Sequence, residues 1–287
     1  MTAIYKKELK SYFLNMTGFV FISFLLLMTG IFVTAYNLLY AFASLTYAIG
    51  SLQLVLMLTV PMLSMRIIAE EKKNRTDQLL YSLPIPMHKI VLAKYLAMLT
   101  VFLIPTAIVS LYPPILSMFG AVPLYPSYAA LLGFFLLGAA LIALCMFFSS
   151  LCESQVIAAV IGFGTILLLY LLPTLSLMLP PTASASLLAF LLCGALIALL
   201  LYAISKSLFL SIGCGTLLVL PTLIVYIAKP SLFQGLFRRL LGSLAVFSRF
   251  ENLVSGIFDV TAIVYYLSII VFFVFLTVQS MEKKRYA

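Results

Sequence analysis

The sequence is poor in charged residues. Only 9% of its 287 residues are Asp, Glu, Lys or Arg, whereas 64% are hydrophobic. A soluble domain carries about 25% charged residues, so most of this chain has no water to face. Several apolar runs of roughly 20 residues match the hydrocarbon thickness of a bilayer. The composition therefore predicts an all-α fold, a polytopic bundle of transmembrane helices.

Motifs that carry chemistry are also missing. The sequence contains no phosphate-binding G-x-x-x-x-G-K-[ST] loop, no H-E-x-x-H pair and no G-x-S-x-G turn. The four cysteines have no metal-ligand spacing, and the single histidine, His88, lies in a polar loop. We therefore expect a non-catalytic chain that binds no cofactor or metal. The 17 Lys and Arg are scattered over several loops, which argues against a nucleic-acid partner.

Ionisable residues are scarce within the expected spans as well. None of these spans carries Lys, Arg, Asp or Glu near its middle. Ion-driven transporters and channels usually place such groups there to bind or relay the ion, so we expect energy to enter from outside the membrane. The eight expected spans are 16–36, 46–67, 95–118, 128–149, 155–179, 187–205, 208–228 and 260–280.

Two features of these spans bear on topology. Only Lys206 and Ser207 separate 187–205 from 208–228, so the pair could instead form one re-entrant hairpin and leave six spans. Either number is even and places both termini on one side. That side holds 13 of the 17 Lys and Arg. The positive-inside rule then predicts a multi-pass plasma-membrane protein with both termini in the cytoplasm.

Two amphipathic segments are expected to lie against the membrane. Residues 3–14 place Lys6, Lys7 and Lys10 opposite an apolar face, which predicts a helix in the cytoplasmic interface. This helix is either a basic anchor or a connector that also borders a partner subunit. Residues 232–247 predict a second such helix on the outer leaflet, and Asp259 is a candidate N-cap for the last span.

The main polar segment is residues 66–94, which carry six of the Lys and Arg, three acids and the only histidine. A helix is expected to leave the second span and carry Glu70 and Glu71. A short helix follows and ends at Pro84, and a second helix begins near Met87 and enters the third span. We expect this elbow to lie across the cytoplasmic surface. Its mixture of charges and leucines suits a protein interface; a solvated loop is the alternative.

Three stretches of the sequence are informative together. The second is residues 149–155, which read SSLCESQ, and the third runs from Phe250-Glu251-Asn252 to the basic tail. The first follows the second span and consists of Glu70-Glu71, Lys72-Lys73, Thr76, Leu79-Leu80, Pro84-Ile85 and Lys94. With these stretches the chain resembles the ABC-2 class of ABC transporter permeases, and within it the gliding-motility/nitrous-oxide-type branch. The family often has Gly where this chain has Arg75.

The resemblance implies a function and partners. Residues 1–287 would form a single ABC-2 type permease domain, the membrane-spanning subunit of an ATP-driven exporter. ATP and Mg would bind to a separate ABC ATPase subunit, and a second permease copy or a related permease would complete a homo- or heterodimer in the lipid. The residues expected to contact the ATPase are Glu70, Glu71, Lys72, Arg75, Thr76, Leu79, Leu80, Pro84, Glu153 and Ser154.

Two other classes of membrane protein, a secondary transporter or channel and a lipid-modifying enzyme, fit the sequence less well. A stand-alone secondary transporter or channel is the alternative, and the lack of ionisable groups within the spans argues against it. A membrane-embedded enzyme acting on lipids would need a nucleophile or a metal cluster, and the sequence offers neither. Lipidic, peptidic and glycan cargoes all remain compatible with the sequence. The segment expected on the outer leaflet suggests cargo handling there, or contact with an extracytoplasmic accessory protein.

Overall fold

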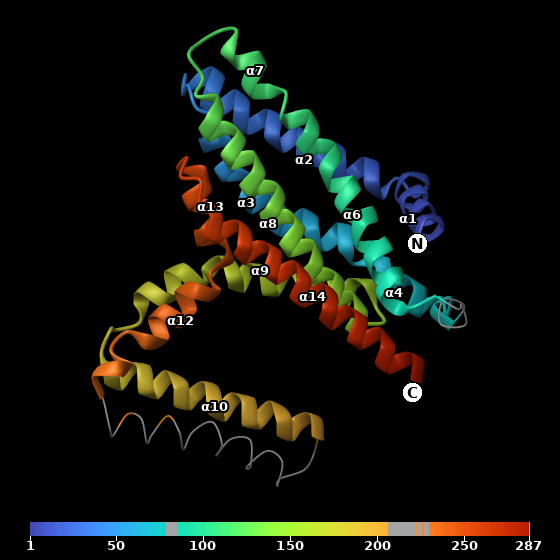
Figure 1. The fold of residues 1–287 in the computed structure, drawn as a ribbon, viewed down its shortest axis with the longest axis vertical. Coiled ribbons are helices and arrows are strands. Elements are labelled where there is room, and N and C mark those ends of the chain that lie inside the picture. The colour runs from blue at the N-terminus through green and yellow to red at the C-terminus, as the bar shows by residue number, and fades with distance from the viewer. Residues whose placement is uncertain (79–84, 206–221, 223–225, 227–229, 287) are drawn as a thin grey trace. The chain divides into compact units, whose positions relative to one another are not determined.

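The computed structural model describes residues 1–286 except 79–84, 206–221, 223–225 and 227–229. All regular elements in the described part are helices, as expected for a chain that must satisfy its backbone hydrogen bonds inside a bilayer. The helices form two compact units (Figure 1). Unit 1 comprises Met1–Leu168 and Val246–Ala287, and unit 2 comprises Leu169–Ala245. That residues 1–287 form one permease domain stays a prediction.

Unit 1 is built from long helices and a few short ones. The division between the units falls within α9, after Leu168. The elements of unit 1 are α1 (Thr2–Leu14), α2 (Thr17–Val33), the π-helical η1 (Thr34–Leu39), α3 (Thr46–Ser64), α4 (Arg66–Lys73), α6 (Met87–Val109), α7 (Tyr112–Ser117), α8 (Leu124–Leu151), the first part of α9 (Gln155–Met178), α13 (Val246–Val254) and α14 (Val260–Tyr286).

Helix α8 is the centre of unit 1. It packs against α3, α4, α6, α13 and α14, and most of its length is buried. Small residues on α8 let its neighbours approach closely, since a Cβ added to Gly138 would overlap the ring of Phe102 on α6. That ring is fully buried and stacks on Phe135, with centroids 5.8 Å apart. Phe21 and Phe134 enclose it from two further directions.

The spans agree well with the sequence-based expectation. Among the described residues, six helices are long and apolar enough to cross a membrane. The expected span 187–205 lies within α10 (Ala183–Ser205). The expected span 208–228 lies almost entirely outside the described residues, so the choice between eight spans and six stays open. The six helices are Thr17–Leu39, Thr46–Lys73, Met87–Ser117, Leu124–Leu151, Gln155–Met178 and Val260–Lys283.

Unit 2 contains the last part of α9, α10, the 3-10 helix η2 (Pro230–Phe233) and α12 (Leu236–Leu244). Phe190 on α10 packs edge-on against Phe233 and Phe237, with ring centroids 6.0 and 5.1 Å away. The segment expected to form one surface helix is therefore divided at Ala245. Part of its apolar side faces α10, while α13 packs against α3 and α8 in unit 1.

Both ends of the described chain lie at the same end of unit 1 (Figure 1). The N-terminal end of α14 has the expected N-cap, because Asp259 Oδ1 accepts a hydrogen bond of 2.9 Å from the Thr261 amide. Its second donor is the Thr261 hydroxyl, and this bond is the main reason that the Asp259 pKa is lowered from its ordinary value. The cap confirms the predicted start of the last span.

The tight contact between α6 and α8 gives a first prediction. Gly138→Ala should lower the free energy of unfolding by about 1–3 kcal/mol, because the enclosed Phe102 ring has no space into which to move. Gly30→Ala on α2 is the control, since a Cβ there meets nothing within 4 Å. Thermal unfolding of the detergent-solubilised protein, followed by circular dichroism, should separate the two variants. Equal stability would contradict this account of the packing.

Candidate functional site

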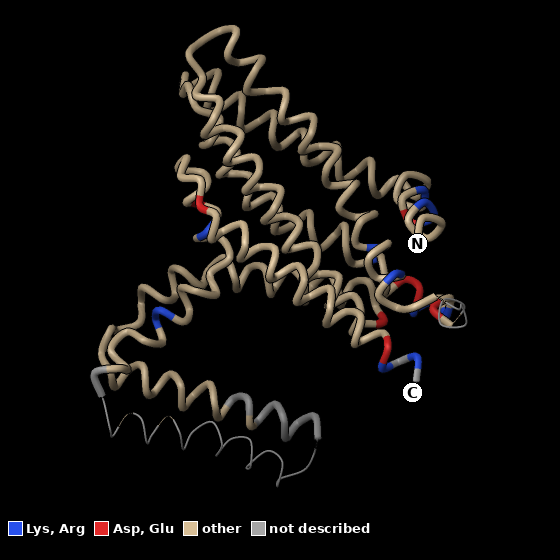
Figure 2. Tube along the Cα trace, in the orientation of Figure 1, with Lys and Arg blue, Asp and Glu red and all other residues tan. Residues whose placement is uncertain are grey.

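The charged residues of unit 1 gather mainly at one end, around α1, α4 and the last turns of α14 (Figure 2). Helix α4 continues α3 after a break of one residue at Met65. Its apolar residues Ile67, Ile68 and Ala69 are buried. Lys72 and Lys73 occupy its last turn, where positive charge interacts favourably with the helix dipole. As predicted, α4 extends from the second span, and α6 begins at Met87.

The centre of this end is the buried amine of Lys94 on α6, which is 0% exposed. Lys94 Nζ donates to Glu8 Oε1 at 3.1 Å and to the Ile67 carbonyl at 3.0 Å. Its third neighbour is Glu71 Oε2 at 2.8 Å. Two of the three ammonium donors thus form hydrogen bonds. Glu71 Oε2, which has no hydrogen-bond partner, is held by Lys94 as an ion pair. Lys94 therefore connects three helices: α1 through Glu8, α4 through Glu71, and its own helix α6.

Lys7 completes this group. Its Nζ lies 3.4 Å from Glu71 Oε1 and 3.6 Å from Glu8 Oε1, and its side chain is 63% exposed. We call Lys7, Glu8, Glu71 and Lys94 the ionic cluster. The two positive and two negative charges balance, as burial requires. Because Lys7 is largely exposed, its share of the stability is at most about 1 kcal/mol.

Two tyrosines hold α1 in place beside the ionic cluster. The Tyr12 hydroxyl donates to the Leu63 carbonyl near the end of α3 at 2.9 Å. The Tyr5 hydroxyl and Thr100 Oγ1 on α6 are 2.9 Å apart. Tyr12 is buried, whereas the three lysines Lys6, Lys7 and Lys10 are exposed. The three lysines and the buried face thus lie on different sides of α1, and the buried face, which includes Glu8, packs on protein. That α1 lies in the membrane interface stays a prediction.

A second set of bonds fixes α4 to the end of α8. Ser149 Oγ accepts from the Ala69 amide at 3.1 Å and donates to the Met65 carbonyl at 3.1 Å. Lys72 Nζ donates to the Ser150 carbonyl. These bonds bring together the two regions predicted to contact an ATPase, which lie about 80 residues apart in the sequence.

Residues 73–76, the last residue of α4 and the turn that follows it, are exposed. Arg75 has φ +56°, in the left-handed region. A residue with a Cβ costs about 1–2 kcal/mol there, and glycine avoids this cost. The turn is closed by the Thr76 amide, which donates to the Glu71 carbonyl at 2.9 Å.

The predicted contact residues fall into three groups. Glu70, Glu71 and Lys72 form bonds within the chain, and Glu70 binds Arg66 through two hydrogen bonds of 2.8 and 3.0 Å. The exposed residues of the set are Arg75, Thr76 and Glu153, and Ser154 is half-buried. Leu79, Leu80 and Pro84 lie outside the described residues.

Sequence reasoning missed Glu8. It placed Lys94 correctly at the opening of the third span but did not predict that Lys94 is buried. A signal was present, because Ile4, Glu8 and Tyr12 are spaced four residues apart and share one helix face. An acid on an apolar face needs a buried cation, and Lys94 begins an apolar run. In the part of the chain that the structure describes, His, Cys, Asp and Glu form no group that could hold a metal.

The ionic cluster gives a second prediction. Lys94→Met should destabilise the protein by roughly 3–5 kcal/mol, because it leaves Glu8 and Glu71 buried without their partner. Adding Glu8→Gln to this variant should recover part of the loss, since one uncompensated charge is removed. Lys89→Met is the control: it changes an exposed lysine on the same helix and should stay within 0.5 kcal/mol of wild type. Equal unfolding temperatures for Lys94→Met and Lys89→Met would contradict the buried role of Lys94.

Comparison with known proteins places the chain in a family. The family described as ABC-2 family transporter protein matches residues 40–185, just over half of the chain. The matched region contains α4, Lys94 and the end of α8, and so most of the site described above. No curated protein and no solved structure matches the chain. The match shows that the chain belongs to the ABC-2 family of transporter proteins and is a membrane component of a transporter.

Proposed function

We propose that the chain is the permease subunit of an ATP-driven exporter, and that a separate ABC ATPase binds at the turn after α4. The permease itself has no catalytic role, and ATP and Mg bind to the ATPase. Family membership supports the class. The geometry around α4 supports the place where the ATPase acts.

The observation that carries the proposal is the fixation of α4 on three sides. The ionic cluster binds it to α1 and α6, and Ser149 binds it to α8. A partner can shift a conformational equilibrium only through contacts that differ between the two states. A displacement of this α4 surface would be passed to three long helices at once. A solvated loop, the alternative expected from composition, would not transmit it.

The exposed residues define the docking face. Glu70 and Glu71 are occupied by Arg66 and by the ionic cluster, so they act as internal supports of α4. The turn at 73–76 presents Lys73 and Arg75 to solvent, and Glu153 is exposed just after α8. We assign the docking face to this turn and the 151–154 connector, facing a groove on the ATPase with complementary charge.

The distribution of charged and apolar surface supports an orientation of unit 1 in the membrane and further partners. Both ends of the chain and most of the exposed cations of unit 1 lie at one end, which the positive-inside rule places in the cytoplasm of a cell with this protein in its plasma membrane. Helices α2, α9 and α14 keep long exposed apolar faces. Lipid and a second permease, identical or related, are the partners that we assign to these faces. An extracytoplasmic accessory protein would bind at the opposite end.

The docking face gives a third prediction. Lys73→Glu/Arg75→Glu should weaken binding of the ATPase that co-purifies with the wild-type chain by at least about tenfold, because two contacts become repulsive. Lys10→Glu/Lys283→Glu makes the same change in net charge at exposed positions elsewhere and should bind like wild type. The measurement is ATPase pull-down together with stimulation of ATP hydrolysis in proteoliposomes.

Two outcomes would contradict the proposal. Full stimulation of hydrolysis by Lys73→Glu/Arg75→Glu would show that the ATPase docks elsewhere. Dissipation of a pH or Na⁺ gradient by the purified permease alone would favour the stand-alone transporter or channel. Thermal unfolding of both double variants distinguishes lost docking from lost folding. All four positions are exposed, so Lys73→Glu/Arg75→Glu should lose no more than about 1 kcal/mol, from the reversed charge at the end of α4.

A further inference from the structure

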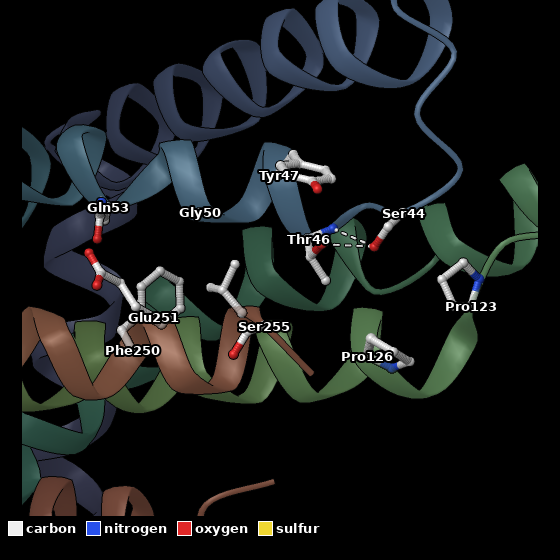
Figure 3. A pocket seen from close by; sticks show the side chains of 11 residues that line it. Ser44, Thr46, Tyr47, Gly50, Gln53, Pro123, Pro126, Phe250, Glu251 and Ser255 are labelled. Atoms are coloured by element: carbon white, nitrogen blue, oxygen red, sulfur yellow. Dashed lines mark hydrogen bonds between the residues drawn. The ribbon is translucent and has the colours of Figure 1, made fainter. Parts of the chain in front are cut away.

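A cavity of about 570 Å³ lies in unit 1 at the end opposite the ionic cluster. It is formed where α3 and α8 begin and α13 ends (Figure 3). Its volume falls in the range of small-molecule sites. Pro123 and Pro126 form one wall and Phe250, buried in the core, another. The position is independent of the docking face and of any ATPase.

Two hydrogen-bond acceptors of this cavity lie close together, the Glu251 carboxylate and the Gln53 side-chain carbonyl. Glu251 directs its carboxylate toward Gln53, as Figure 3 shows. Gln53 Oε1 is buried and has no hydrogen-bond partner. Glu251 forms no ion pair among the described residues. The nearby cation Arg249 lies over the ring of Tyr265 instead, with its Cζ 5.6 Å from the ring centroid.

The exposed carboxylate of Glu251 lies beside the buried, unpartnered Gln53 Oε1, and a donor with positive charge would suit both. A buried carbonyl without a partner costs about 1–3 kcal/mol, and an ammonium group would satisfy it and neutralise Glu251 together. The hydroxyls of Ser44 and Thr46, 2.8 Å apart, lie at the other end of the cavity, away from Gln53 and Glu251 (Figure 3). Phe250, next to Glu251 in the sequence, and Tyr47 also line the cavity, and aromatic rings can attract organic cations.

We propose that this cavity binds a small primary ammonium group, held by the Glu251 carboxylate and Gln53 Oε1. The group can belong to a free amine or to the ethanolamine headgroup of a lipid. A hard metal ion fits less well, because Ca²⁺ takes six to eight oxygen ligands and only one carboxylate lines the cavity. A quaternary ammonium lacks the N–H donors that Gln53 requires.

The test measures binding of protonated ethanolamine to the full chain in nanodiscs of phosphatidylglycerol, by saturation-transfer NMR. Wild type should bind ethanolamine and should not bind ethylene glycol, its neutral counterpart. Glu251→Gln should weaken binding at least about tenfold, the effect of losing a charged hydrogen bond. Gln53→Leu should weaken it about threefold to tenfold. The control Glu282→Gln, an acid on α14, should bind like wild type.

Further arms identify the source of the amine and the result that would overturn the site. Adding phosphatidylethanolamine to the nanodiscs should displace free ethanolamine if the lipid headgroup binds, and should leave its binding unchanged if free amines do; either result supports the site. Equal binding by wild type and Glu251→Gln would overturn it. Wild-type binding by Gln53→Leu would also contradict it, and would indicate that the amide is rotated so that Nε2 donates to Glu251.

Discussion

One buried charge holds the polar end of this protein together. Lys94 is inaccessible to solvent, and its amine is stabilised only if acceptors from other helices reach it. Two acids meet this requirement: Glu8, which lies 86 residues before Lys94 in the sequence, and Glu71, which lies 23 residues before it. The position of α1 against α6, and that of α4 against both, follow from this requirement. Exposed surface pairs could not impose it, because each is worth at most about 1 kcal/mol.

The scarcity of charge makes the few charged groups informative. Unit 1 keeps one group at the α4 end and a smaller one on α13, with apolar helices between them. Helices α3 and α8 run from the acceptor-lined cavity to the ionic cluster. At 1.5 Å per residue, the 28 residues of α8 span about 42 Å. Two polar sites thus lie at the two ends of the same packed helices.

Much of the fold was predictable because it depends on local composition. A run of apolar residues predicts a span wherever it lies, and proline predicted the start of α6 after Pro86. Tertiary contacts decided the rest. The apolar pattern at 232–247 continues without interruption, yet the chain divides at Ala245, because Phe247 and Phe250 pack onto the helices of unit 1 while Phe233 packs onto α10. No pattern within one segment contains that choice.

The roles of Glu70 and Glu71 show the same limit at the site. Their sequence context, an acidic pair before basic residues in a polar segment, is equally consistent with a contact to a partner and with an internal support. The distinction depends on Arg66 one helical turn away and on Lys94, whose partner Glu8 lies on a different helix. Because these acids are occupied, the docking face that we propose depends on the exposed charges of residues 73–76 and of Glu153. The strained left-handed Arg75 keeps its side chain exposed there, and a glycine would relieve the strain but remove the charge. The exposed charge of Arg75 therefore comes with a local backbone cost, and it is one of the charges on which the docking face that we propose depends.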